Sequence, residues 1–210
     1  MNEKKSYRAS ILQRWSISAA ELTELVDNNP SLRGIMLGYV AEFHLIKTLT
    51  SVCPAIKDMG KSDDHSRANK GDRIIKYRGI EIKVESKSLQ TNSIQQLFDE
   101  KTGKKIWTGK TQVDASDRRT VRFPNGTTLE TTCLKCGEFD LLAVNCFEFE
   151  KRWHFAFAKN SDLPHSTYKK YSTYQRKHLL ATLVPVTWPP QPPFYSDPIV
   201  VLKSIIKERR

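Results

Sequence analysis

Residues 71–88, GDRIIKYRGIEIKVESKS, are the segment that most constrains the fold. Apolar and charged residues alternate on both sides of Arg78-Gly79, and a period of two residues is typical of β-strands. Glycine tolerates the positive φ that tight hairpin turns require, so we expect a β-hairpin that turns at Arg78-Gly79. Counting outward from this turn pairs Asp72 with Glu85.

A second register of the same segment would pair Asp72 with Glu81. It would centre the turn on Lys76-Tyr77, two residues that are poorly suited to positive φ. The cost is about 1 kcal/mol or more for each unfavourable turn residue. The sequence therefore predicts the register that places Asp72 opposite Glu85.

In this register two carboxylates converge on adjacent strands. Glu85 and Lys87 share a face because side chains alternate along a strand, whereas Ser86 points the other way. Opposed like charges are destabilising unless something neutralises them. A divalent cation would do so, and hard oxygen ligands suit Mg²⁺. The alternative is a solvated strand face on which the lysines alone balance the acids.

Asp72, followed by Glu85-Ser86-Lys87, resembles the motif of the PD-(D/E)XK nuclease superfamily, which includes restriction endonucleases and junction resolvases. Gly71 stands where the motif name places proline. The resemblance implies that Asp72, Glu85 and the main-chain carbonyl of Ser86 hold Mg²⁺, with Mn²⁺ as a substitute. It also implies that Lys87 orients the attacking water.

An N-terminal helix that offers a glutamate is a frequent part of the same pattern. Asn29 and Pro30 begin a predicted helix that runs to about residue 50. Glu42 lies on its apolar stripe, which we expect to face the core: Leu32, Ile35, Tyr39, Phe43, Ile46 and Leu49. The resemblance implies that Glu42 belongs to the outer shell of the metal site. The alternative is a core glutamate paired with an arginine or a lysine.

The remaining sequence predicts an α/β fold in a single domain, residues 1–210. The apolar run 139–145 is typical of a central strand, and the alternating run 153–158 is expected to pair with it. We expect a restriction-endonuclease-like central mixed β-sheet flanked by helices, with its core at about residues 30–158. Residues 159–210 are expected to form a basic, Pro-rich C-terminal extension that ends in an amphipathic helix. A short helix is expected around residues 93–100.

The net charge of +11, from 34 Lys and Arg against 23 Asp and Glu, favours a polyanionic partner. We expect double-stranded DNA. Two segments rich in cations are the candidate contacts, the first for base edges and the second for phosphates. Their cations are Arg118, Arg119 and Arg122, and then Lys169, Lys170, Arg176 and Lys177.

Four cysteines in 210 residues do not make a disulfide framework. The pair Cys133 and Cys136 supplies only two of the four ligands of a structural zinc, so no zinc is expected. No apolar run approaches the roughly 20 residues that cross a bilayer, and a soluble, cytoplasmic protein without a membrane partner is expected.

These observations predict an Mg²⁺-dependent DNA endonuclease, most consistent with a restriction enzyme. Because cutting both strands of a duplex usually calls for two sites, a homodimer is expected by analogy. The alternatives are a structure-specific nuclease of repair or recombination and a non-catalytic basic DNA-binding module.

Overall fold

The structure is a computed structural model that describes residues 9–61, 72–100 and 103–209. The chain divides into two compact units, Met1–Val40 and Ala41–Arg210, so that the boundary falls within helix α3. None of the helices in the described ranges is both long and apolar enough to span a membrane.

The first unit is helical. It contains α1 (Ile11–Trp15), α2 (Ala19–Asn28) and the first part of α3 (Pro30–Val52). A capping box begins α2: Ser18 Oγ accepts a hydrogen bond from the main chain of Glu21, and the Glu21 carboxylate accepts one from the main chain of Ser18. The predicted start of the long helix at Pro30 is confirmed. Neither α1 nor α2 contains a buried residue.

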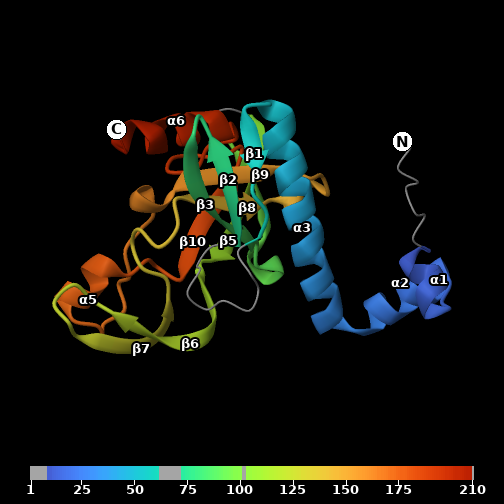
Figure 1. The fold of residues 1–210 in the computed structure, drawn as a ribbon, viewed down its shortest axis with the longest axis horizontal. Coiled ribbons are helices and arrows are strands. Elements are labelled where there is room, and N and C mark those ends of the chain that lie inside the picture. Colours follow the sequence, from blue (N-terminus) through green and yellow to red (C-terminus); the bar gives the residue numbers. More distant parts are fainter. Residues whose placement is uncertain (1–8, 62–71, 101–102, 210) are drawn as a thin grey trace, which may run out of the picture. The chain divides into compact units, whose positions relative to one another are not determined.

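The second unit is built on a five-stranded mixed sheet in the order β1-β2-β3-β8-β9 (Figure 1). Its strands are β1 (Ile56–Asp58), β2 (Arg73–Tyr77), β3 (Ile80–Ser88), β8 (Leu141–Asn145) and β9 (Phe155–Lys159). β3 and β8 run parallel, and the other neighbours are antiparallel. The predicted central strand and its antiparallel partner are therefore confirmed as β8 and β9.

Two smaller sheets and three helices complete this unit. A three-stranded sheet has the order β10-β5-β4, and β6 pairs with β7 in a separate ribbon. The bounds are β4 (Gln95–Asp99), β5 (Lys104–Gln112), β6 (Asp114–Arg122), β7 (Thr128–Cys133), β10 (Leu183–Trp188), α4 (Phe147–Glu150), α5 (Thr173–His178) and α6 (Pro198–Glu208). Single 3₁₀ turns occupy Thr91–Ser93 and Asn160–Asp162.

The β2–β3 hairpin has the predicted turn and register. Arg78 and Gly79 have φ values of 50° and 84°, as a tight hairpin turn requires. Tyr77 pairs with Ile80, and the pairing extends to Arg73 opposite Val84. One further step along each strand gives Asp72 and Glu85.

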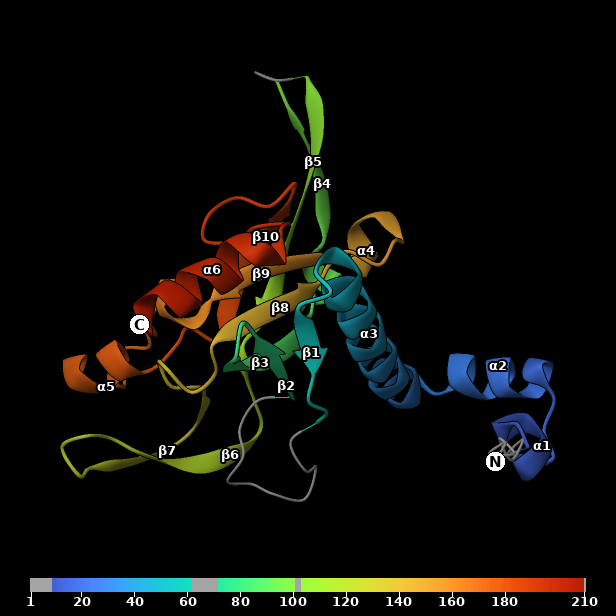
Figure 2. The same cartoon turned by 45° about the horizontal axis from the view of Figure 1, so that its top comes forward.

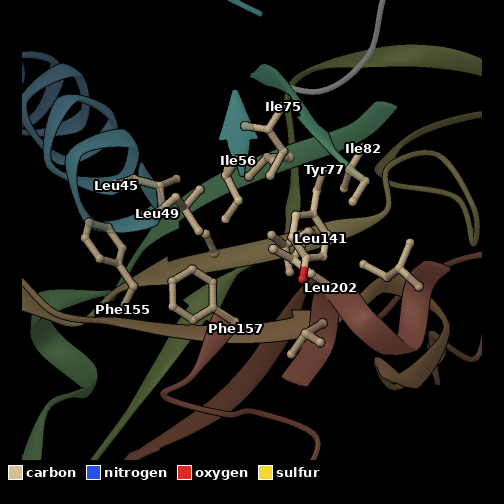
Figure 3. Close-up of a cluster of buried hydrophobic side chains, with 14 of the residues drawn as sticks. Leu45, Leu49, Ile56, Ile75, Tyr77, Ile82, Leu141, Phe155, Phe157 and Leu202 are labelled. Atoms are coloured by element: carbon tan, nitrogen blue, oxygen red, sulfur yellow. The ribbon is translucent and has the colours of Figure 1, made fainter. Parts of the chain in front are cut away.

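Apolar side chains cover both faces of the five-stranded sheet. On one face, Leu45 and Leu49 of α3 and Leu202 of α6 pack against strand residues such as Ile82 and Leu141 (Figure 3). On the other face, Leu142 and Val144 of β8 belong to a cluster with Val184 and Val186 of β10 and Phe149 of α4. The sheet is thus held between helices on one side and the three-stranded sheet on the other.

The predicted apolar stripe of α3 is only partly correct. Leu49 is buried, but Phe43 is 65% exposed, and Ile35 and Tyr39 are exposed as well. The buried residues of α3 are Ala41, Leu45 and Leu49, at a spacing of four residues. The buried row of α3 lies next to the predicted stripe, and the spacing of apolar residues in the sequence does not distinguish two adjacent rows of a helix.

Two other expectations are corrected. Residues 95–99 form strand β4 instead of a helix, because they pair with β5. The Pro-rich C-terminal segment is also more regular than expected. Residues 183–188 form β10 at the edge of its sheet, a position that tolerates Pro185. The predicted amphipathic helix at the C-terminus is confirmed as α6, which buries its apolar face in the core.

Candidate active site

Asp72 lies immediately before β2, where the antiparallel pairing with β3 ends. Its Oδ2 accepts a hydrogen bond of 2.8 Å from the main-chain N–H of Ser86. The N–H and C=O of one residue in an extended strand point to the same side, so the carbonyl of Ser86 faces Asp72 too. This contact fixes the Asp72 carboxylate next to the residue that follows Glu85.

Glu85 is the buried carboxylate of the site, with only 7% of its surface exposed. It pairs with Leu142 across the parallel β3–β8 ladder, so its side chain lies on the face covered by the second apolar cluster. Burial raises the pKa of Glu85 to about 7; Lys87 lowers it in part, and the charge of Asp72 raises it further. The charges of the two carboxylates therefore repel each other.

Lys87 neutralises part of this charge. Its Nζ lies 2.8 Å from Oε1 of Glu85. Burial alone would lower the pKa of Lys87, but attraction to Glu85, Asp72 and Asp114 outweighs burial and raises it. An ammonium group beside two carboxylates is the arrangement that the sequence predicted for residues 72–87.

The oxygen atoms at this place fit a magnesium ion. Asp72 and Glu85 offer carboxylates, and Ser86 offers a main-chain carbonyl on the same side. Within the described ranges no group of three or more His, Cys, Asp or Glu side chains is placed to hold a metal. Mg²⁺ does not need such a group, because it is commonly held by one or two carboxylates and keeps several waters.

The carboxylate of Glu42 interacts with two cationic side chains. Its Oε2 lies 2.6 Å from Nζ of Lys61, and its charge also acts on the guanidinium of Arg73. Arg73 itself is held by Asp58, at 2.7 Å. This is the arrangement expected of the alternative role, in which a basic partner satisfies a partly buried glutamate.

The other Glu-x-Lys pair of β3 lies toward the hairpin turn. Glu81 and Lys83 have exposed side chains, in contrast to Glu85. Among the described residues, their contacts are made by main-chain atoms: the N–H of Lys83 donates to Asp140, and the carbonyl of Glu81 accepts from Arg209. Their side chains therefore serve as matched controls for Glu85 and Lys87.

The two cation-rich segments lie together in one lobe, which we call the basic lobe: β6, β7 and residues 168–179 (Figures 1 and 2). A small apolar cluster holds it together, formed by Val121, Phe123, Cys133, Leu179 and their neighbours. The hydroxyl of Tyr171 lies 2.7 Å from Thr131 Oγ1, and that of Tyr174 accepts from the main chain of Asn125. These two tyrosines therefore join residues 168–179 to the β6–β7 ribbon.

The cations of the basic lobe differ in what they contact. Arg118 and Arg122 are exposed, as are Lys169, Lys170 and Lys177, and Arg176 is half-buried. Arg119 instead forms a two-pronged ion pair with Glu138, with its Nη1 at 2.6 Å from Oε1, and it also donates to the carbonyl of Cys133. Arg119 is therefore a structural group of the lobe, and it is removed from the candidate base contacts.

The two cysteines of the Cys-x-x-Cys pair lie in different surroundings. Cys133 is buried, with its Sγ 3.9 Å from the hydroxyl of Tyr171, whereas the Sγ of Cys136 is 3.8 Å from the carbonyl of Lys177. Both are free thiols. Burial raises the pKa of the Cys136 thiol, which disfavours the thiolate that a metal would need.

Two further acids act on the site. Asp114, at the start of β6, is one of the charges that raise the pKa of Lys87. Glu138 raises the pKa of Glu85. Neither residue belongs to a local motif, and both lie far from residues 72–87 in the sequence. The sequence alone therefore gives no indication that they act on this site.

Comparisons with known proteins give one structural likeness. No family model and no curated protein sequence matches the chain. Among solved structures it is similar to a bacterial homing endonuclease, I-Ssp6803I, with 16% identity and a TM-score of 0.32 over 68% of this chain and 85% of that one. A likeness at this level supports no assignment, and the function must be argued from the site.

Proposed function

We propose that this chain is a metal-dependent DNA endonuclease of the restriction type. The observation that carries the proposal is the convergence of Asp72, Glu85 and Lys87 at the start of β2, with Lys87 at 2.8 Å from Glu85. A buried carboxylate with a raised pKa, such as Glu85 beside Asp72, is costly to a fold that does not use it. A divalent cation bound between the carboxylates would neutralise their charge and offset that cost.

Each residue of the site has a role in the proposed reaction. Asp72, Glu85 and the carbonyl of Ser86 hold Mg²⁺, or Mn²⁺ in its place. The bound ion supplies polarisation of the scissile phosphate and a lowered pKa for a water molecule. Lys87 holds the water in line with phosphorus and balances the negative charge that develops on the phosphate oxygens.

Duplex DNA is the proposed substrate. The net charge of +11 favours a polyanion, and the basic lobe presents exposed cations on two adjoining segments. Arg118 and Arg122 are proposed to reach base edges, and Lys169, Lys170, Arg176 and Lys177 to contact phosphates. Cutting both strands requires two sites, for which a homodimer is proposed.

Incubation of the protein with supercoiled plasmid tests this function. Discrete fragments in the presence of Mg²⁺, and none with EDTA, are expected of a restriction-type nuclease. Nicking or branched-DNA preference would replace the restriction role with one in repair or recombination. DNA binding without any metal-dependent cutting would leave only a binding module.

Metal binding is also expected to stabilise the fold, because a ligand that binds only the native state adds RT ln(1 + [L]/Kd) to the free energy of unfolding. At about 100 times Kd, Mg²⁺ adds about 2.7 kcal/mol. A thermal melt should therefore shift upward with Mg²⁺ in the wild type and not in Asp72→Asn. An equal shift in both proteins would place the metal elsewhere.

The phosphate contacts are tested by Lys169→Ala combined with Lys170→Ala. Each phosphate contact contributes about 0.9 to the slope of log Kobs against log[salt], so the slope should fall by about 2 for all DNA sequences. Lys203→Ala with Lys207→Ala removes the same charge from exposed positions of α6 and should leave the slope unchanged. Equal slopes in the two double variants would move the DNA surface away from residues 169–170.

A further inference from the structure

The hairpin formed by β4 and β5 projects from the other elements of its unit (Figure 2). β10 pairs with β5 only from Trp107 to Gln112. Beyond Trp107, therefore, the ribbon consists of two paired strands only, with Leu97–Asp99 opposite Lys104–Ile106. An isolated two-stranded ribbon is marginally stable in water, so its base must be held firmly or its tip covered by a partner.

The base of the hairpin is held firmly. Trp107 stacks on Phe149 with ring centroids 6.1 Å apart, and both side chains belong to the second apolar cluster. Gly109 approaches the same ring so closely that a Cβ there would lie 3.1 Å from Phe149. The base of the hairpin is thus anchored to the body of the second unit.

The projecting part of the hairpin exposes large apolar side chains, which a binding partner would stabilise by burying them. Leu97 and Phe98 are 51% and 64% exposed, and successive residues of a strand point to opposite faces. Phe98 shares its face with Lys105, its cross-strand partner. Gln95, Gln96 and Lys104 are exposed as well.

The base of the β4–β5 hairpin lies next to the end of β3, the strand that carries Glu85 and Lys87. The N–H of Gln90, three residues after Lys87, donates to the carbonyl of Lys110 in β5, and Leu89 bridges to Thr111. From Lys110 to Lys104 is about 20 Å along an extended strand. That length corresponds to about six base pairs of duplex.

We propose that the β4–β5 hairpin enters a groove of the DNA duplex a few base pairs from the scissile phosphate. This inference rests on the proposed nuclease function. A two-stranded ribbon fits the major groove, where glutamine and lysine side chains read base edges. Lys104 and Lys105 supply positive charge, and Phe98 is the type of side chain that contacts the methyl group of thymine in this groove.

The experiment compares footprints on one duplex that contains a cut site mapped on plasmid by the wild-type protein. Lys87→Ala protein with Mg²⁺ is used so that the duplex is bound and not cut. This protein is expected to protect a segment that extends about six base pairs from the cut site on either side, because each subunit of the proposed homodimer carries one hairpin. Adding Lys104→Ala and Lys105→Ala, or Phe98→Ser, should remove only that segment of protection.

The controls separate the hairpin from the nuclease function itself. Lys203→Ala with Lys207→Ala should leave the whole footprint intact. Melting curves with unchanged midpoints show that the hairpin variants are folded.

If the wild type neither binds nor cuts plasmid, the nuclease function fails. If it cuts and the hairpin variants keep the full footprint, the inference about the hairpin fails. Sedimentation velocity covers the remaining case: loss of a dimer in the Phe98→Ser variant would make the hairpin a self-association arm and overturn its role in DNA binding.

Discussion

Replacing Glu85 by alanine is expected to lower the rate of DNA cleavage by at least about 10³-fold, a barrier increase of about 4 kcal/mol. The change removes one of two carboxylates from the proposed metal site and leaves Lys87 without its partner at 2.8 Å. Lys87→Ala should be equally inactive. DNA binding by both variants should survive, because the exposed cations of the basic lobe are untouched. Plasmid cleavage and a binding titration, made on the same preparations, measure the two effects.

Glu81→Ala and Lys83→Ala are the matched controls on the same strand. Both side chains are exposed, and their structural contacts are made by main-chain atoms that alanine retains. Cleavage should stay within about tenfold of the wild type, which is a barrier change of about 1.4 kcal/mol. An inactive Glu81→Ala beside an active Glu85→Ala would show that the catalytic carboxylate is not the one placed opposite Asp72.

Glu138→Ala is expected to destabilise the protein by about 2–3 kcal/mol. The side chains of Arg119 and Glu138 are 19% and 5% exposed, so removal of the carboxylate leaves a guanidinium charge largely buried and unpaired. The change also removes the acceptor of the Lys135 main-chain N–H. Urea unfolding, followed by circular dichroism, gives the free energy of unfolding.

Two further variants check the cause of that loss. Arg118→Ala, at an exposed position of the same strand, should change the free energy of unfolding by no more than about 0.5 kcal/mol. Arg119→Met combined with Glu138→Leu removes both charges and should recover much of the lost stability. A Glu138→Ala protein as stable as the wild type would mean that Arg119 is free to contact DNA after all.

The hairpin could be predicted from sequence because its determinants are local. A single glycine after Arg78 fixes the turn, and the turn fixes which acid lies opposite Asp72. The capping box at Ser18 is equally local, since both hydrogen bonds join residues three apart. In such cases the nearest neighbours along the chain decide the structure.

The remaining features depend on contacts between distant segments. Residues 95–99 become a strand because β5 lies beside them. The ion pair of Arg119 with Glu138 needs the β6–β7 ribbon to be formed, and no spacing in the sequence distinguishes Arg119 from the exposed Arg118. Likewise, the row of α3 that is buried is chosen by the sheet it covers.

The position of β3 between β2 and β8 has a consequence for biosynthesis. Asp72 and Ser86 meet within one hairpin, 14 residues apart, whereas β8 joins β3 across a separation of 57 residues, as the contact of Lys83 with Asp140 shows. When the hairpin has just left the ribosome, the nascent chain already contains Asp72, Glu85 and Lys87. The strand β8, which lies beside Glu85 in the folded protein, has not yet been made. At about 5–20 residues per second, several seconds of synthesis separate the two strands. The growing polypeptide is thus without an assembled site until β8 has been made.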